Sequence, residues 1–183
     1  MSAEISTIKL FQDIRSEDLV ALYETLHEAE LATPNIDSIA DQICCPGLDF
    51  CNLASASSIP IAKTLSERFS NHEELDDIGT LHLNMSGCVN ACGHHHTGHI
   101  GILGVDRRGT ECYQVKVGGH PGTDDNTPAA IGEIVGPSVT ADELVPLIDR
   151  ILDVYRKERV GEETFIETYK RIGVSPFKEA SRG

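Results

Sequence analysis

Apolar residues recur every three or four positions in two stretches of the chain, and this spacing predicts two amphipathic helices. The first stretch follows Ser16, a residue suited to the N-cap of a helix, and continues to residue 32. The second follows Thr140 and Glu143, which match a capping box. Its apolar stripe consists of Leu144, Leu147, Ile148, Ile151 and Leu152. A shorter helix is expected behind Pro60, because proline suits the first turn of a helix.

Alternating apolar and polar residues in the middle of the chain predict strands. One such stretch, residues 81–85, leads almost directly to Cys88. Two more, at 100–105 and 110–118, flank a short turn and predict a hairpin. Residues 5–14 also lean towards a strand. Helices mixed with a central hairpin favour an α+β fold.

Glycine and proline interrupt these patterns in two places, which we interpret as loops. Residues 119–138 form the longer of the two. Residues 44–52 form the other, and they contain three of the six cysteines of the chain. The shorter loop is therefore a candidate for a metal-binding or catalytic site.

Composition narrows the class of protein. The 183 residues are 40% hydrophobic and 24% charged, which is typical of a globular chain. Fifteen Lys and Arg against 29 Asp and Glu give a net charge of -14, which argues against non-specific nucleic-acid binding. We see no apolar run long enough for a membrane span and no signal peptide at the N-terminus. A cytoplasmic location is expected.

The cysteine spacing is the strongest chemical signal. Cys45 and Cys51 form a C-x5-C pair, Cys88 and Cys92 form a C-x3-C pair, and 36 residues separate the pairs. Reduced cytoplasmic cysteines more often bind metal or take part in catalysis than form disulfides. Four thiolates suit an iron–sulfur cluster. Zinc and unliganded thiols remain alternatives, although paired zinc ligands usually lie two to four residues apart.

Other polar residues beside the cysteines have both functional and ordinary interpretations. Cys44 and Cys112 are interpreted as buried residues without chemistry. The run from His94 to His96 either contacts an anionic cofactor or substrate, or is a polar surface loop. Asn90 either turns its amide towards a cofactor or caps a turn.

These motifs together resemble a known family. CPGLDFC followed by SGCVNACGHHHTGHIGILG is similar to the signature of the siroheme-containing sulfite and nitrite reductases. YQVKVGG and ETFIETYKRIGVSPFKE resemble a strand and the C-terminal helix of these enzymes. The stretch 5–34 resembles the strand and helix that precede their cluster. The resemblance thus covers nearly the whole chain.

The resemblance implies an oxidoreductase and assigns residues to two cofactors. By position, a [4Fe–4S] cluster is held by Cys45, Cys51, Cys88 and Cys92. Cys92 additionally bridges to the siroheme iron, and Asn90, His94 and His95 lie near the siroheme. The implied reaction is the six-electron reduction of sulfite to sulfide, with nitrite to ammonia as the alternative. A ferredoxin or a flavoprotein is the expected electron donor.

The resemblance also implies an architecture. We expect a ferredoxin-like, two-layer mixed sheet with helices, and the cluster in loops at the sheet edge. Residues 1–43 are interpreted as the remainder of a preceding half-domain, and 44–183 as the cluster- and siroheme-binding domain. Family members are considerably longer, and their N-terminal half supplies the other siroheme wall and the substrate-binding arginines and lysines. The chain thus resembles the C-terminal portion of such a reductase.

Two further hypotheses belong to other functional classes. The first is a small electron-transfer module that binds a cluster without siroheme, since Cys92 can ligate a cluster alone. The second is a structural zinc protein. Siroheme absorption separates the first from the reductase, and metal analysis separates the second from both.

Overall fold

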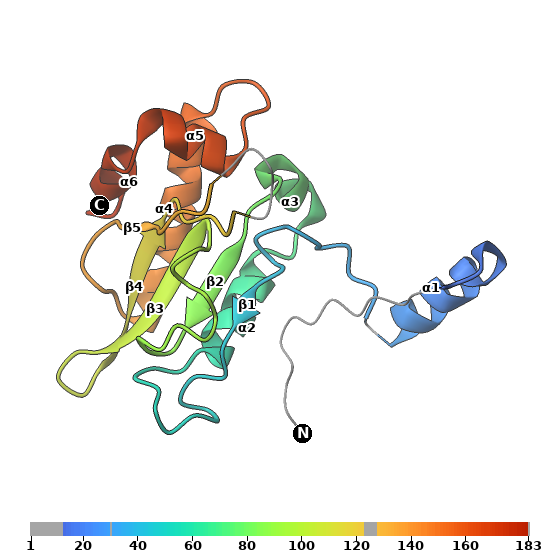
Figure 1. The fold of residues 1–183 in the computed structure, drawn as a ribbon, viewed down its shortest axis with the longest axis horizontal. Coiled ribbons are helices and arrows are strands. Elements are labelled where there is room, and N and C mark those ends of the chain that lie inside the picture. Colours follow the sequence, from blue (N-terminus) through green and yellow to red (C-terminus); the bar gives the residue numbers. More distant parts are fainter. Residues whose placement is uncertain (1–12, 30, 123–127, 183) are drawn as a thin grey trace.

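A five-stranded mixed sheet organises the fold (Figure 1). The computed structural model describes residues 13–29, 31–122 and 128–182. In spatial order the strands are β1 (Ile43–Cys44), β2 (Leu83–Ser86), β3 (Ile100–Asp106), β4 (Glu111–Val117) and β5 (Glu133–Ile134). Strands β1, β2 and β3 run parallel to one another. Strand β4 pairs antiparallel with both β3 and β5. The predicted α+β class with a mixed sheet is confirmed.

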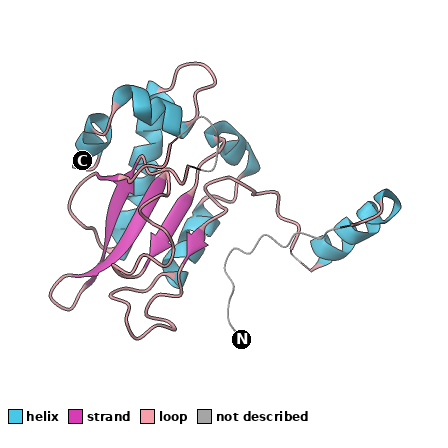
Figure 2. Cartoon of the chain, viewed as in Figure 1, coloured by secondary structure: helices cyan, strands magenta, loops and turns pink. Residues whose placement is uncertain are grey.

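The helices gather mainly on one side of this sheet (Figure 2). They are the 3-10 helix η1 (Ser16–Asp18) and the α-helices α1 (Leu19–Glu28), α2 (Ile59–Arg68), α3 (His72–Ile78), α4 (Ala141–Glu158), α5 (Phe165–Ile172) and α6 (Ser175–Ala180). Helix α4 contacts β4, α2, α5 and α6. The capping box of Thr140 and Glu143 is confirmed, and the apolar stripe behind it is buried. Helix α4 is therefore the main partner of the sheet.

Strand register divides the sheet into two faces of different character, because side chains alternate along a strand. The face towards the helices, here termed the core face, carries Leu83, Met85, Ile100, Ile102, Val115 and Val117. The opposite face, here termed the loop face, carries Asn84, Ser86, Cys112, Gln114 and Lys116, together with the apolar Leu103 and Val105. One face of the sheet thus makes the hydrophobic core, and the other presents polar groups beside Leu103 and Val105.

Several boundaries differ from the sequence prediction. The helix expected at 16–32 is a 3-10 turn and a helix that ends at Glu28. The loop predicted at 44–52 includes the second residue of the two-residue strand β1, and the loop predicted at 119–138 includes the whole of β5. Strands this short are defined by pairing with a neighbour, so their own sequence carries little signal. Most of the predicted strand at 5–14 lies outside the described residues.

Helix α1 lies apart from the sheet in Figure 1, where it is drawn in blue. None of its residues is buried, and Leu19, Val20 and Tyr23 are 52%, 68% and 57% exposed. The amphipathic pattern predicted the helix, but its apolar side does not contact the core. Among the described residues, no helix is long and apolar enough to cross a membrane.

Candidate metal centre

The two cysteine motifs begin at the same end of the sheet. Cys45 follows the last residue of β1, and Cys88 lies two positions after the last residue of β2. Strands β1 and β2 are parallel neighbours, so their carboxyl ends meet at one edge. The topology therefore brings together two motifs that lie 36 residues apart in the sequence.

Direct hydrogen bonds join the two cysteine loops. The N–H of Gly87 donates to Cys45 Sγ over 3.0 Å. The Cys45 N–H donates to the carbonyl of Met85 over 3.1 Å. In return, the carbonyl of Gly87 accepts from the N–H groups of Ser55 and Ala56 at 2.8 and 3.0 Å. The C-x5-C loop and the turn before Cys88 therefore form one packed unit.

Two glycines make this close packing possible. Gly47 has φ +60°, and a Cβ there would lie 2.5 Å from the backbone nitrogen of Ser58. A Cβ on Gly87 would lie 2.6 Å from the carbonyl oxygen of Ala56 and 2.9 Å from the Cα of Gly47. A larger residue in place of Gly87 would push the two loops apart, and one in place of Gly47 would clash with the segment that follows the C-x5-C loop.

The four predicted ligands differ in exposure. Cys88 is buried, Cys45 and Cys51 are half-buried, and Cys92 is exposed. All four are free thiols. Among the described residues, no three Cys, His, Asp or Glu side chains already form a metal-binding group. The structure thus brings the two loops together without converging the four sulfurs on one point.

Of the two remaining cysteines, both interpreted from the sequence as buried, Cys112 is buried and Cys44 is half-buried. Cys44 packs against the core from β1, and its thiol contacts the carbonyl of Cys45 at 3.1 Å. Burial, followed by the charges of Cys45 and Asp49, raises the pKa of the Cys44 thiol to about 12. Cys112 is buried on β4. A protonated thiol is a poor metal ligand, so Cys44 is not a candidate.

The histidine-rich segment packs onto the loop face of the sheet. Asn84 Nδ2 donates to the carbonyl of His94 over 3.1 Å, and Ser86 Oγ accepts from the N–H of Gly93 over 3.1 Å. A Cβ on Gly101 would lie only 1.9 Å from the carbonyl oxygen of His95. The interpretation of this run as a polar surface loop is wrong for His95, because two polar strand residues hold the backbone against the sheet.

His95 is the most unusual polar group of this segment. It is fully buried, and neither ring nitrogen has a hydrogen-bond partner among the described residues. Burial, followed by the neighbouring His96 and Lys116, lowers the pKa of His95 to about 4. Lys116 Nζ lies 3.2 Å from His96 Nδ1. The unpaired ring nitrogens match a site where a further polar group binds.

The other two predicted cofactor contacts lie on the surface. Asn90 is exposed in the turn between the cysteines of the C-x3-C pair. His94 is exposed and has φ +53°. The sequence interpretation did not single out Lys116 or Ser58, which lie beside the histidines and Cys45 respectively. Lys116 was only one polar residue of an alternating strand, and Ser58 had only its place before Pro60 as a signal.

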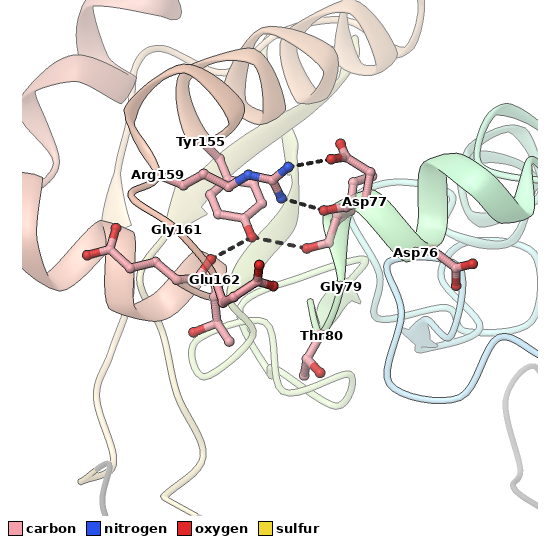
Figure 3. Close-up of a pocket in the computed structure, with 11 residues that line it drawn as sticks. Asp76, Asp77, Gly79, Thr80, Tyr155, Arg159, Gly161 and Glu162 are labelled. Atoms are coloured by element: carbon pink, nitrogen blue, oxygen red, sulfur yellow. Dashed lines mark hydrogen bonds and ion pairs between the residues drawn. The ribbon is translucent and has the colours of Figure 1, made fainter.

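A separate cavity of about 300 Å³ is lined by residues 76–80, by Tyr155 and Arg159, and by residues 161–164 (Figure 3). Its polar groups largely bond one another. The hydroxyl of Tyr155 contacts the carbonyls of Ile78 and Glu163 at 3.2 and 3.0 Å, and Arg159 pairs with Asp77. Among the residues that the structure describes, no cysteine or histidine lines this cavity. We interpret it as the joint between α3 and the end of α4, distinct from the cysteine loops.

Comparisons with known proteins agree on one family. The sequence profile described as "Nitrite and sulphite reductase 4Fe-4S domain" matches residues 36–182. A sulfite reductase of assimilatory type from Nitratidesulfovibrio vulgaris is 25% identical over 142 residues, which cover 76% of this chain and 59% of that protein. A sulfite reductase [ferredoxin] from Mycobacterium tuberculosis is 32% identical over 136 residues, which cover 68% of this chain and 23% of that protein.

A solved structure shows the same likeness. The Mycobacterium tuberculosis NirA protein superposes with a TM-score of 0.71 at 28% identity, over 90% of this chain and 31% of that one. The chain therefore spans less than two thirds of the length of these relatives.

The buried imidazole of His95 makes stability depend on pH in the metal-free protein. Its pKa lies near 4 when folded and 6.5 as the ordinary value, so the unfolded chain binds more protons between these values. The contribution of this group to the free energy of unfolding is therefore fully present above pH 6.5. It is lost as the pH falls towards 4. From about pH 7 to pH 5 this group lowers the free energy of unfolding by about 2 kcal/mol.

Urea unfolding of wild type and His95→Leu at several pH values measures this effect. We expect the free energy of unfolding of His95→Leu to fall less between about pH 7 and pH 5 than that of wild type. His72→Leu, at an exposed position, keeps the wild-type dependence on pH. Equal slopes in wild type and His95→Leu would contradict the assignment.

Proposed function

The chain belongs to the nitrite and sulphite reductase 4Fe-4S domain family, and from this premise we propose that its two cysteine loops hold a [4Fe–4S] cluster. The ligands are Cys45, Cys51, Cys88 and Cys92. The observation that carries this proposal is the bond from Gly87 N–H to Cys45 Sγ, which ties one motif to the other. Cysteine thiolates are the usual ligands of such clusters, and backbone N–H groups stabilise their negative charge.

We propose that the loop face carries siroheme beside this cluster. Cys92 is exposed and is assigned as the bridging ligand, with Asn90 and His94 exposed near it in sequence. His95 offers two ring nitrogens that have no hydrogen-bond partner in the described part of the chain. By register, the described strands place Lys116 on this face and no Asp or Glu. Donors without competing carboxylates suit a polycarboxylate macrocycle.

With these cofactors the proposed reaction is the six-electron reduction of sulfite to sulfide by an assimilatory sulfite reductase. Siroheme and the cluster supply the electron-transfer chemistry, and the chain supplies ligation, orientation and exclusion of water. Nitrite reduction to ammonia is the alternative, because the family name covers both substrates. A ferredoxin or flavoprotein in the cytoplasm is the proposed donor, and an additional polypeptide half is proposed to complete the substrate site.

The proposed domain division separates residues 1–43 from the cluster- and siroheme-binding part at 44–183. The exposed helix α1 supports a distinct first segment. Ile39 is fully buried in the core, and the family profile begins at residue 36. We therefore propose that packing of the cluster domain starts at about residue 36, a little before the division inferred from the sequence.

Replacing single cysteines tests the ligand assignment. Cys45→Ser or Cys88→Ser is expected to abolish cluster binding, because serine is a poor ligand for iron at neutral pH. Cys112→Ser is the matched control, since Cys112 is buried on β4 away from both loops in sequence. Iron content of the protein purified without oxygen is the measurement. Equal loss of iron in all three variants would overturn the assignment.

An absorbance spectrum tests whether the chain binds siroheme as well as the cluster. The protein is purified without oxygen from cells that make siroheme. We expect a split haem-type spectrum together with a broad iron–sulfur shoulder. A shoulder alone would reject siroheme binding by this chain and favour the electron-transfer module.

A further inference from the structure

Ser58 occupies an unusual position for a serine that begins a helix. It is the N-cap residue of α2, yet its side chain makes no capping hydrogen bond. The side chain is fully buried, and its Oγ lies 3.7 Å from Cys45 Sγ. The hydroxyl is therefore directed at the sulfur in place of the usual helical N–H groups.

The surroundings of Ser58 hold it in this place. A Cβ on Gly47 would lie 2.7 Å from Ser58 Oγ, and a Cβ on Gly87 would lie 3.0 Å from it. The preceding residue, Ser57, is fixed through its backbone to β4. Its N–H donates to Glu111 Oε2 over 2.7 Å, and its carbonyl accepts from the hydroxyl of Tyr113 over 2.9 Å. The hydroxyl of Ser58 is thus confined by glycines on one side and anchored by a strand on the other.

We propose that Ser58 is a positioning residue that sets the reduction potential of the cluster through Cys45. This inference rests on the proposed [4Fe–4S] cluster. A ligated sulfur carries no proton, so it accepts hydrogen bonds and Ser58 O–H becomes the donor. Together with Gly87 N–H at 3.0 Å, it gives this sulfur two donors.

Hydrogen bonds to Cys45 Sγ are expected to raise the reduction potential of the cluster. Reduction adds one electron to the cluster and makes its sulfurs more negative. Hydrogen bonds to those sulfurs therefore stabilise the reduced form more than the oxidised form and raise the potential. The N-terminal end of α2 carries a partial positive charge beside Cys45, which acts in the same direction.

Ser58→Ala in the full chain is the test, with Ser57→Ala as the matched control. Both proteins are reconstituted with iron and sulfide without oxygen and titrated with dithionite, and the reduced cluster is followed by electron paramagnetic resonance. Ser58→Ala is expected to change the ratio of oxidised to reduced cluster about tenfold at a fixed potential, a fall of about 59 mV in midpoint. Ser57→Ala keeps the wild-type midpoint, because only its backbone bonds are in use.

The outcomes separate this inference from the proposed function. An unchanged midpoint in Ser58→Ala, with the cluster present, would overturn the role of Ser58 and leave the cluster assignment intact. Loss of the cluster in Ser58→Ala alone would also overturn it, since the residue would then be structural. Absence of a cluster from the wild-type protein would overturn the proposed function itself.

Discussion

The close contact between Gly47 and Gly87 is the constraint on which the candidate site depends. It lets the backbone of one cysteine loop lie against the backbone of the other, with Gly87 N–H directed at Cys45 Sγ. Parallel pairing of β1 with β2 brings the loops to one edge, and the missing side chains let them touch. A site built from two distant motifs therefore rests on strand pairing and on two positions without a Cβ.

The two faces of the sheet have different roles in folding and in the candidate site. The core face buries aliphatic side chains against α4 and provides the hydrophobic free energy of folding. The loop face holds polar side chains that fix the backbone of the histidine segment, and within the described part of the chain both ring nitrogens of the buried His95 lack a hydrogen-bond partner. In a chain of net charge -14, this face contributes Lys116 and no carboxylate from the described strands. That contrast suits the binding of an anionic cofactor.

Sequence reasoning succeeded where the signal was local. The capping box at Thr140 and the hairpin of β3 and β4 depend on residues close together in the chain, and both were predicted. The cysteine spacing identified the candidate ligands, and the resemblance named the family. Burial of His95 could not be predicted, because it depends on Asn84 and Ser86 of a neighbouring strand. The contact of Ser58 with Cys45 was equally hidden, since it joins residues through a folded loop.

We propose that these two loops hold one iron–sulfur cluster. Quantifying iron, acid-labile sulfide and zinc in the protein purified without oxygen tests it most directly. We expect about four iron atoms and about four sulfides per chain, with no stoichiometric zinc. One zinc ion per chain without sulfide would contradict it, and the cysteines would then form a structural zinc site.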